Sequence, residues 1–220
     1  MKACVLVALT LFMLANNSLA LTTEDAAFVN NVLASGKLPL STDDRIAIKK
    51  MGSEALDPIA EAYEKANIRR KTELAHLLWR LGLENEKATQ ALLKDARTRH
   101  PDLRLQVQYA LGSVSGDTVI VETLLDTMRN DPNGLFRDKA ACSMANDLRH
   151  LNYEQKYLLF RGLVDGLNDE KYQVRKISIK ALNVHLGQKF GYKPESGIVE
   201  REASIARWHE WLEEYRQEAL

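Results

Sequence analysis

The stretch from Asp169 to Leu182, DEKYQVRKISIKAL, decides the fold. Its apolar residues recur at the spacing of one face of an α-helix, and the polar residues between them leave the opposite face for water. The apolar set is Val174, Ile177, Ala181 and Leu182. This stretch therefore predicts a short amphipathic helix that is buried along one side.

The same periodicity continues through almost the whole chain after Thr22, and the period-two alternation of β-strands is nearly absent. Helix-end signals separate the segments: Thr22 opens a capping-box pattern, Asp57 precedes a proline as a predicted N-cap, and Gly82, Gly112 and Gly116 are predicted breaks. The sequence thus predicts an all-α protein of short, closely connected helices.

Three segments share one local pattern around an arginine: DLRLQVQYAL, GLFRDKAACSM and YQVRKISIKAL. The aligned arginines, Arg104, Arg137 and Arg175, are 33 and 38 residues apart, which is enough for one helical hairpin each. Helical hairpins repeated at such periods must stack on their neighbours to bury their apolar faces. We therefore expect a short right-handed α-solenoid of stacked antiparallel hairpins.

The pattern D-x-x-x-x-V-R-x-x-x-x-x-A-L in the opening stretch resembles the HEAT and HEAT-like (phycobilin-lyase-type) repeat, and MGSEALDPIAEAY is similar to the first helix of that repeat. The segment DLRLQVQYAL departs from the family pattern because no aspartate turn precedes it. The resemblance implies an armadillo-type superhelix, with repeats over residues 51–187 and an N-terminal helical cap over residues 21–50. It also implies an alternative function, binding of a chromophore or another small molecule.

Residues 1–20, MKACVLVALTLFMLANNSLA, have the features of a secretory signal: Lys2 at the start, an apolar run and small residues before Ala20. The run is shorter than the roughly 20 residues that span a membrane. We expect cleavage after Ala20, a periplasmic or secreted protein, and no stable membrane insertion afterwards. The alternative is an uncleaved N-terminal anchor.

The charge balance and the cysteine and histidine content argue against several classes of function. The chain has 30 basic and 30 acidic residues, which argues against the broad positive field of a nucleic-acid binder. Cys142 is the single cysteine after the predicted signal, and its alanine-rich surroundings favour a small buried side chain. The five histidines show no ligand spacing, so neither a metal nor another cofactor is predicted.

Residues 188–220 combine a turn rich in glycine and aromatic residues with a final helix. Its aromatic side chains are predicted to cover the open face of the last repeat, as terminal caps must. The alternative is an aromatic ligand pocket. Both interpretations rest on Phe190, Tyr192, Trp208, His209 and Trp211.

No catalytic constellation is evident, so an enzyme is unsupported rather than excluded. The predicted function is a noncatalytic interaction module, adaptor or assembly factor that binds another protein or peptide in the cell envelope. The predicted contact residues are Arg104, Gln108, Arg137, Arg175 and Lys180. Alternatively, the three arginines form a structural ladder with Asp131, Asp138 and Asp169.

Overall fold

The computed structural model describes residues 21–217, so the predicted signal peptide lies outside the described residues. The described chain is all-α, as the periodicity predicted. Its α-helices are α1 (Thr23–Ala34), α2 (Thr42–Met51), α3 (Asp57–Lys65), α4 (Ile68–Leu81), α5 (Glu86–Leu93), α6 (Pro101–Val114), α7 (Thr118–Asn130), α8 (Gly134–Asn146), α9 (Tyr153–Asp165), α10 (Tyr172–Leu186) and α11 (Ile198–Gln217). Two 3-10 helices, η1 (Ser53–Leu56) and η2 (Gly166–Asn168), precede α3 and follow α9.

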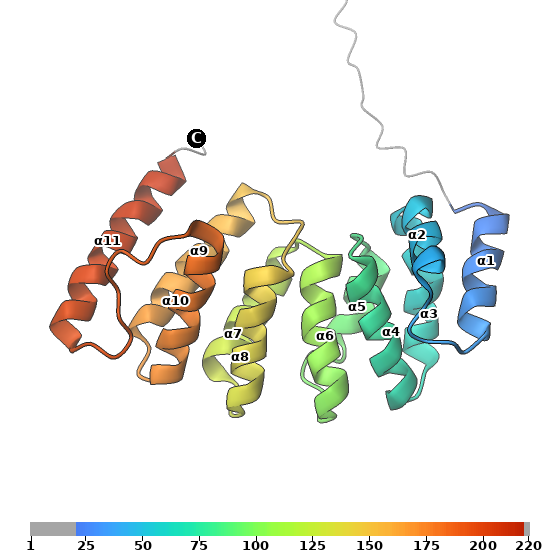
Figure 1. The fold of residues 1–220 in the computed structure, drawn as a ribbon, viewed down its shortest axis with the longest axis horizontal. Coiled ribbons are helices and arrows are strands. Elements are labelled where there is room, and N and C mark those ends of the chain that lie inside the picture. Colours follow the sequence, from blue (N-terminus) through green and yellow to red (C-terminus); the bar gives the residue numbers. More distant parts are fainter. Residues whose placement is uncertain (1–20, 218–220) are drawn as a thin grey trace, which may run out of the picture.

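The helices follow one another across the molecule in chain order, from α1 at one end to α11 at the other (Figure 1). They form two layers. In the first layer, each helix packs on the next one in the order α2, α4, α6, α8 and α10. The second layer contains two such series, one of α1, α3 and α5 and the other of α7, α9 and α11. Each helix therefore makes its main contacts with elements close to it in the chain.

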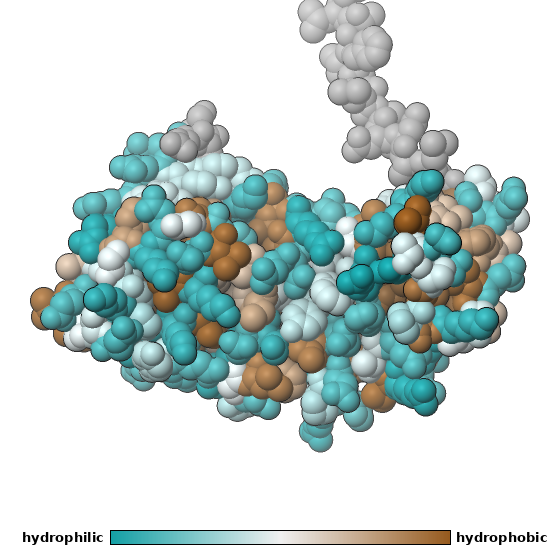
Figure 2. Space-filling model, viewed as in Figure 1, coloured by the Kyte–Doolittle hydropathy of each residue, from teal (hydrophilic) through white to brown (hydrophobic). Residues whose placement is uncertain are grey.

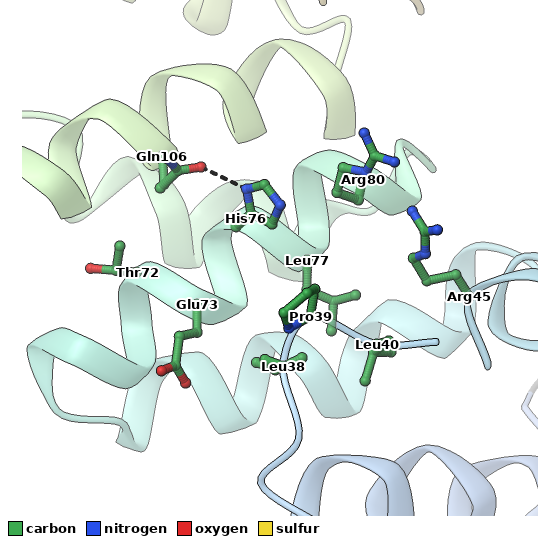
Figure 3. Close-up of a pocket in the computed structure, with 10 residues that line it drawn as sticks. All are labelled: Leu38, Pro39, Leu40, Arg45, Thr72, Glu73, His76, Leu77, Arg80 and Gln106. Atoms are coloured by element: carbon green, nitrogen blue, oxygen red, sulfur yellow. Dashed lines mark hydrogen bonds between the residues drawn. The ribbon is translucent and has the colours of Figure 1, made fainter. Parts of the chain in front are cut away.

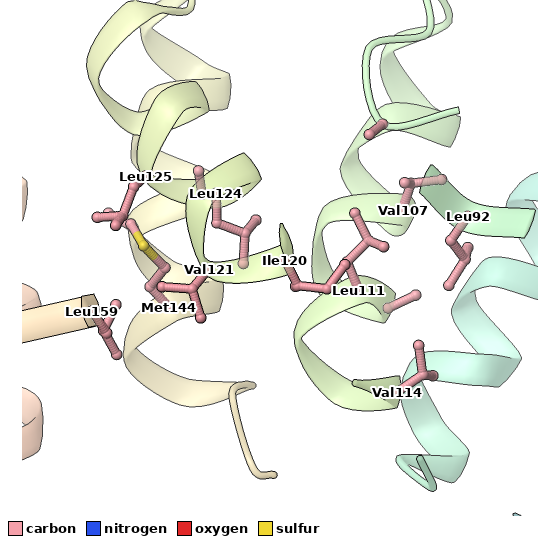
Figure 4. Packing of buried hydrophobic residues seen from close by; sticks show 14 of the residues in the cluster. Leu92, Val107, Leu111, Val114, Ile120, Val121, Leu124, Leu125, Met144 and Leu159 are labelled. Carbon is pink, nitrogen blue, oxygen red and sulfur yellow. The ribbon is translucent and has the colours of Figure 1, made fainter. Parts of the chain in front are cut away.

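A continuous apolar cluster lies between the two layers. Figure 4 shows part of it, where Leu92 of α5, Leu111 of α6, Val121 of α7 and Met144 of α8 lie in one row. All four side chains are buried. Val174, Ile177, Ala181 and Leu182 of the deciding stretch belong to the same cluster, which confirms the predicted buried face of α10. Burial of this kind is the main favourable term in folding.

The helix ends confirm some of the predicted signals and correct others. The Thr22 hydroxyl accepts from the Asp25 backbone N–H at 3.1 Å, as an N-cap does, and Gly82 ends α4 in the left-handed conformation. Asp57 is not an N-cap. The preceding residue, Leu56, is already helical because η1 runs directly into α3, whereas a capping residue needs extended backbone.

Gly112 does not break a helix. It lies inside α6, where a Cβ atom would approach the Ser143 hydroxyl oxygen to 2.9 Å and the Asp147 Cβ to 3.2 Å. The glycine therefore lets α8 pack closely against α6.

Candidate functional site

A groove runs between the α1–α2 loop and the exposed side of α4, and encloses about 520 Å³ (Figure 3). We call it the α4 groove. Its lining residues are Leu38, Pro39, Leu40, Arg45, Thr72, Glu73, His76, Leu77, Arg80 and Gln106. A second cavity, of about 660 Å³, lies against α1, and Pro39 and Leu40 line both, so the loop separates two hollows.

The sequence of α4 explains why this side of the helix is open. Leu74, Leu78 and Leu81 turn into the core, which leaves Thr72, His76 and Arg80 on the other side. The loop is fixed over this side by two features, one apolar and one polar. Leu40 is 7% exposed, and Arg70 Nη2 donates to the Leu33 carbonyl at 2.9 Å, which ties the end of α1 to α4.

The acidic residue of the groove has ion-pair partners, whereas two of its arginines have none. Glu73 is paired with Arg69 at 3.3 Å and with Arg70 at 3.1 Å. Within residues 21–217, no carboxylate lies within 4.0 Å of the guanidinium groups of Arg45 and Arg80. Figure 3 shows these two arginines together at the end of the groove away from Glu73. That end therefore carries an uncompensated positive charge.

Arg45 also contains an unsatisfied donor. Its Nη2 donates to the Thr42 hydroxyl at 3.2 Å, but its Nε is buried and has no hydrogen-bond partner within the described part of the chain. Buried polar atoms are nearly always hydrogen-bonded in native proteins, and each exception calls for an explanation.

His76 and Gln106 connect α4 to α6 on the wall of the groove. His76 Nδ1 donates to the Gln106 side-chain oxygen at 3.1 Å, because an amide oxygen can only accept. In neutral His76 this hydrogen bond leaves Nε2 as an acceptor. The imidazole also makes a T-shaped contact with the Trp79 ring, with ring centroids 5.3 Å apart. The ring is thus held in one orientation.

The three arginines of the repeat pattern lie outside this groove, and each of them bonds to other parts of the chain, although the buried Nε of Arg104 has no hydrogen-bond partner within residues 21–217. Arg104 pairs with Asp131 and stacks on the Phe136 ring at 4.3 Å. Arg137 donates from Nη1 to the Asp131 carbonyl at 2.6 Å and from Nη2 to the Gln173 side-chain oxygen at 2.6 Å.

Arg175 repeats the arrangement of Arg137 in the next hairpin. It donates to the Asp169 and Glu170 carbonyls, both at 2.9 Å, and to the Pro194 carbonyl at 3.1 Å. The carbonyls of Asp131 and Asp169 lie six residues before Arg137 and Arg175, respectively. Contacts at the same offset in two hairpins favour the structural ladder over direct ligand contacts.

The two remaining predicted contact residues occupy different environments. Gln108 of α6 is 2% exposed, and neither polar atom of its side chain has a hydrogen-bond partner within residues 21–217. Lys180 of α10 is exposed and lies beside half-buried Cys142 at a small cleft of about 40 Å³ between α8 and α10. The structure therefore does not bring Gln108 and Lys180 together with the arginines in one open site.

The aromatic residues of the C-terminal segment pack mainly into the core. Trp208 is fully buried and meets Phe190 edge-on at 4.6 Å and Trp211 at 5.7 Å, while the Tyr192 hydroxyl donates to the Leu167 carbonyl. Burial raises the pKa of Tyr192. His209 is exposed on α11. Packing of this kind fits a terminal cap.

Within residues 21–217, no three His, Cys, Asp or Glu side chains gather as metal ligands would. No helix of that part of the chain has both the length and the apolarity to cross a membrane.

No protein-family model matches the chain, and no curated protein matches its sequence.

Sequence reasoning did not find the α4 groove, because residues 21–50 were interpreted as a cap alone. One local signal was present. The segment from Lys37 to Ser41, KLPLS, places two leucines beside a proline in a loop, where exposed apolar residues need a packing partner or a ligand.

Proposed function

We propose that the protein is a noncatalytic interaction module of the cell envelope that binds a segment of a partner protein in the α4 groove. The observation that carries this proposal is the groove itself. It combines a floor of Leu38, Pro39 and Leu77 with two guanidinium groups, those of Arg45 and Arg80, that no carboxylate of the described chain neutralises. Protein interfaces combine an apolar centre with a polar rim, and arginine is enriched in them.

We further propose that the two layers are those of a short right-handed α-solenoid of HEAT-like hairpins. Two features support this arrangement. The helices pack mainly on elements close in the chain, as in repeat proteins, and Arg137 and Arg175 bond carbonyls at the same offset. In such a protein each hairpin depends on its neighbours for burial, so the stack is a stiff support for a groove at one end.

Export is the third part of the proposal, and it rests on the pattern of residues 1–20 alone. It sets where the partner should be sought, which is the periplasm or the exterior. The proposed mechanism is binding without chemistry: a rigid groove holds one segment of the partner and thereby positions both proteins.

A site-specific crosslinking experiment tests the proposed function. A photoreactive amino acid is placed at Thr72, in the α4 groove, or at Glu122, an exposed residue of α7. Tagged protein with each substitution is illuminated in an envelope extract, and crosslinked proteins are identified by mass spectrometry. We expect one partner from the Thr72 protein and none from the Glu122 protein, followed by a stoichiometric complex of the purified pair. A blank from both proteins would contradict the proposal.

A further inference from the structure

We propose that the α4 groove recognises a peptide segment in which an acidic side chain stands next to an apolar side chain. Arg45 and Arg80 bind the carboxylate, and the loop residues Leu38 and Pro39 contact the apolar neighbour. This inference rests on the proposed function and deepens it by naming the chemistry of the bound segment.

Arg45 and Arg80 determine which charge the groove attracts. Guanidinium groups favour carboxylates because their N–H groups form paired, charge-assisted hydrogen bonds with the two oxygens. Arg45 and Arg80 lie at one end of the groove, whereas Glu73, the only acidic lining residue, is already paired with Arg69 and Arg70. A carboxylate is the group that this end lacks.

The loop supplies apolar surface to the groove. Leu38, Pro39 and Leu40 line the groove on one side, and the Leu77 side chain projects from α4 toward them (Figure 3). The hydropathy surface of the molecule shows brown apolar residues among teal polar ones in this N-terminal region (Figure 2). Leu40 and Leu77 are already buried, whereas Leu38 is half-buried and Pro39 is exposed. An acidic group alone would leave the apolar area of Leu38 and Pro39 uncovered, so the bound segment needs an apolar side chain beside its carboxylate.

The shape of the groove favours a segment of chain over a compact small molecule. The α4 residues that line it run from Thr72 to Arg80, a distance of about 12 Å at the rise of an α-helix. An extended peptide covers that distance with about four residues. His76 lies in the middle of this strip, and its Nε2 is placed to accept a hydrogen bond from a peptide N–H. We therefore assign the carboxylate to a side chain within the segment.

The test uses defined peptides and nuclear magnetic resonance. Three probes are titrated into the protein: acetyl-Ala-Leu-Glu-Leu-Ala-amide, the same peptide with Gln in place of Glu, and acetyl-Ala-Leu-Gln-Leu-Ala with a free C-terminal carboxylate. The signals followed are the side-chain N–H groups of Arg45 and Arg80 and the imidazole of His76. We expect saturable shifts with the Glu peptide and an affinity at least about tenfold lower for the other two.

Matched variants locate the binding. Arg45→Gln and Arg80→Gln each should weaken binding of the Glu peptide about fivefold to tenfold. Arg99→Gln, an exposed arginine outside the groove that loses the same charge, should leave the affinity unchanged. Circular dichroism of each variant shows whether it is folded. Because Arg80 is exposed, Arg80→Gln retains a readable test even if Arg45→Gln unfolds.

Each outcome separates the inference from the proposed function. Equal binding of the Glu and Gln peptides, or stronger binding of the free-acid peptide, overturns the acidic side chain as the recognised group. No peptide binding, together with a Thr72 crosslink to a partner, overturns this inference and leaves the interaction module standing. Binding of the Glu peptide without any crosslinked partner supports the inference and counts against the proposed partner protein.

Discussion

Trp79 and Asp147 are 68 residues apart in the chain, yet the indole N–H of Trp79 donates to the Asp147 carboxylate at 2.9 Å. Trp79 is in α4 and Asp147 caps the end of α8, so the hydrogen bond spans α6, which packs on both helices. Gly112 of α6 lies beside this bond and has no side chain to obstruct it. The pair therefore joins α4 to the end of α8 across α6.

This relationship predicts an unusual pH dependence. Burial raises the pKa of Asp147, which is 6% exposed, so the fold favours the neutral acid over the carboxylate. Protonated Asp147 therefore adds to the free energy of unfolding. This contribution is fully present below the ordinary aspartate pKa of 3.8, which applies in the unfolded chain, and it is lost as the pH rises through the higher pKa of Asp147 in the folded protein. Asp147→Asn removes the charge but keeps an oxygen for the Trp79 N–H.

We expect Asp147→Asn to stabilise the protein relative to wild type at about pH 8, and this advantage to shrink towards about pH 4. Urea denaturation of both proteins across that range measures the difference in the free energy of unfolding. Trp79→Phe serves as the control, since it removes the donor without removing the titrating group. A deficit of Asp147→Asn that stayed constant with pH would contradict the argument.

Gly116 predicts a packing effect at the turn between α6 and α7. A Cβ atom at this position would lie 2.3 Å from the His150 carbonyl oxygen and 2.8 Å from its carbon, and a backbone carbonyl moves less readily than a side chain. We therefore expect Gly116→Ala to lower the free energy of unfolding by about 2–3 kcal/mol.

The matched control is Gly36→Ala in the α1–α2 loop. Gly36 has a φ of 70° and no atom within 4 Å of its added Cβ, so only backbone strain applies. That strain costs about 1–2 kcal/mol. Thermal and urea unfolding should rank the Gly116 variant as the less stable of the two. The reverse order would show that the turn can move away from His150.

The elements predicted correctly from the sequence depend on local patterns. The apolar face of α10 and the Thr22 cap are set by residues within a few positions of one another, and both were found. The prediction that Gly112 breaks a helix was wrong. A glycine is needed at this position because of the close approach of α8, which lies more than thirty residues away in the sequence. A glycine inside a helix and a glycine at its end look alike in sequence.

The α4 groove was missed for a related reason. Its two sides come from the loop around Pro39 and from α4, which are brought together only by folding. The pairing of Glu73 with Arg69 and Arg70 lies at local helical spacing, but the absence of a partner for Arg80 becomes visible only when neighbouring elements are placed. An uncompensated charge is therefore a property of the folded surface.

The C-terminal cap predicts that Trp208 is a structural residue. Its side chain is fully buried, and its indole N–H has no hydrogen-bond partner within residues 21–217. Trp208→Ala should cost about 3–5 kcal/mol because it leaves a cavity. Trp208→Phe should cost clearly less, since it keeps an aromatic ring and removes the unsatisfied donor.

His209→Ala on the exposed side of α11 is the control and should change the free energy of unfolding by less than about 0.5 kcal/mol. Denaturation followed by circular dichroism measures all three variants. A ligand pocket built from these rings makes the opposite prediction, with Trp208→Ala stable and defective only in binding.

Arg137 and Arg175 each donate a hydrogen bond to a backbone carbonyl six residues earlier in the chain. Arg137→Glu together with Arg175→Glu would place carboxylates against the carbonyl oxygens of Asp131 and Asp169, where the wild-type guanidinium groups donate at 2.6 and 2.9 Å. Breaking charge-assisted hydrogen bonds costs about 1.5–3 kcal/mol each before repulsion is added. We therefore expect loss of helicity and of a cooperative urea transition.

The control reverses the same two charges elsewhere, at Arg161 of α9 and Lys176 of α10, whose side chains are exposed. Surface substitutions of this kind change stability by about 0.5 kcal/mol or less. If the arginine variant unfolds and the control does not, Arg137 and Arg175 are structural residues whose bonds to the preceding carbonyls the fold requires. If both remain folded and only the arginine variant loses its partner, the arginines contact that partner directly, because their bonds to the carbonyls are then dispensable for the fold.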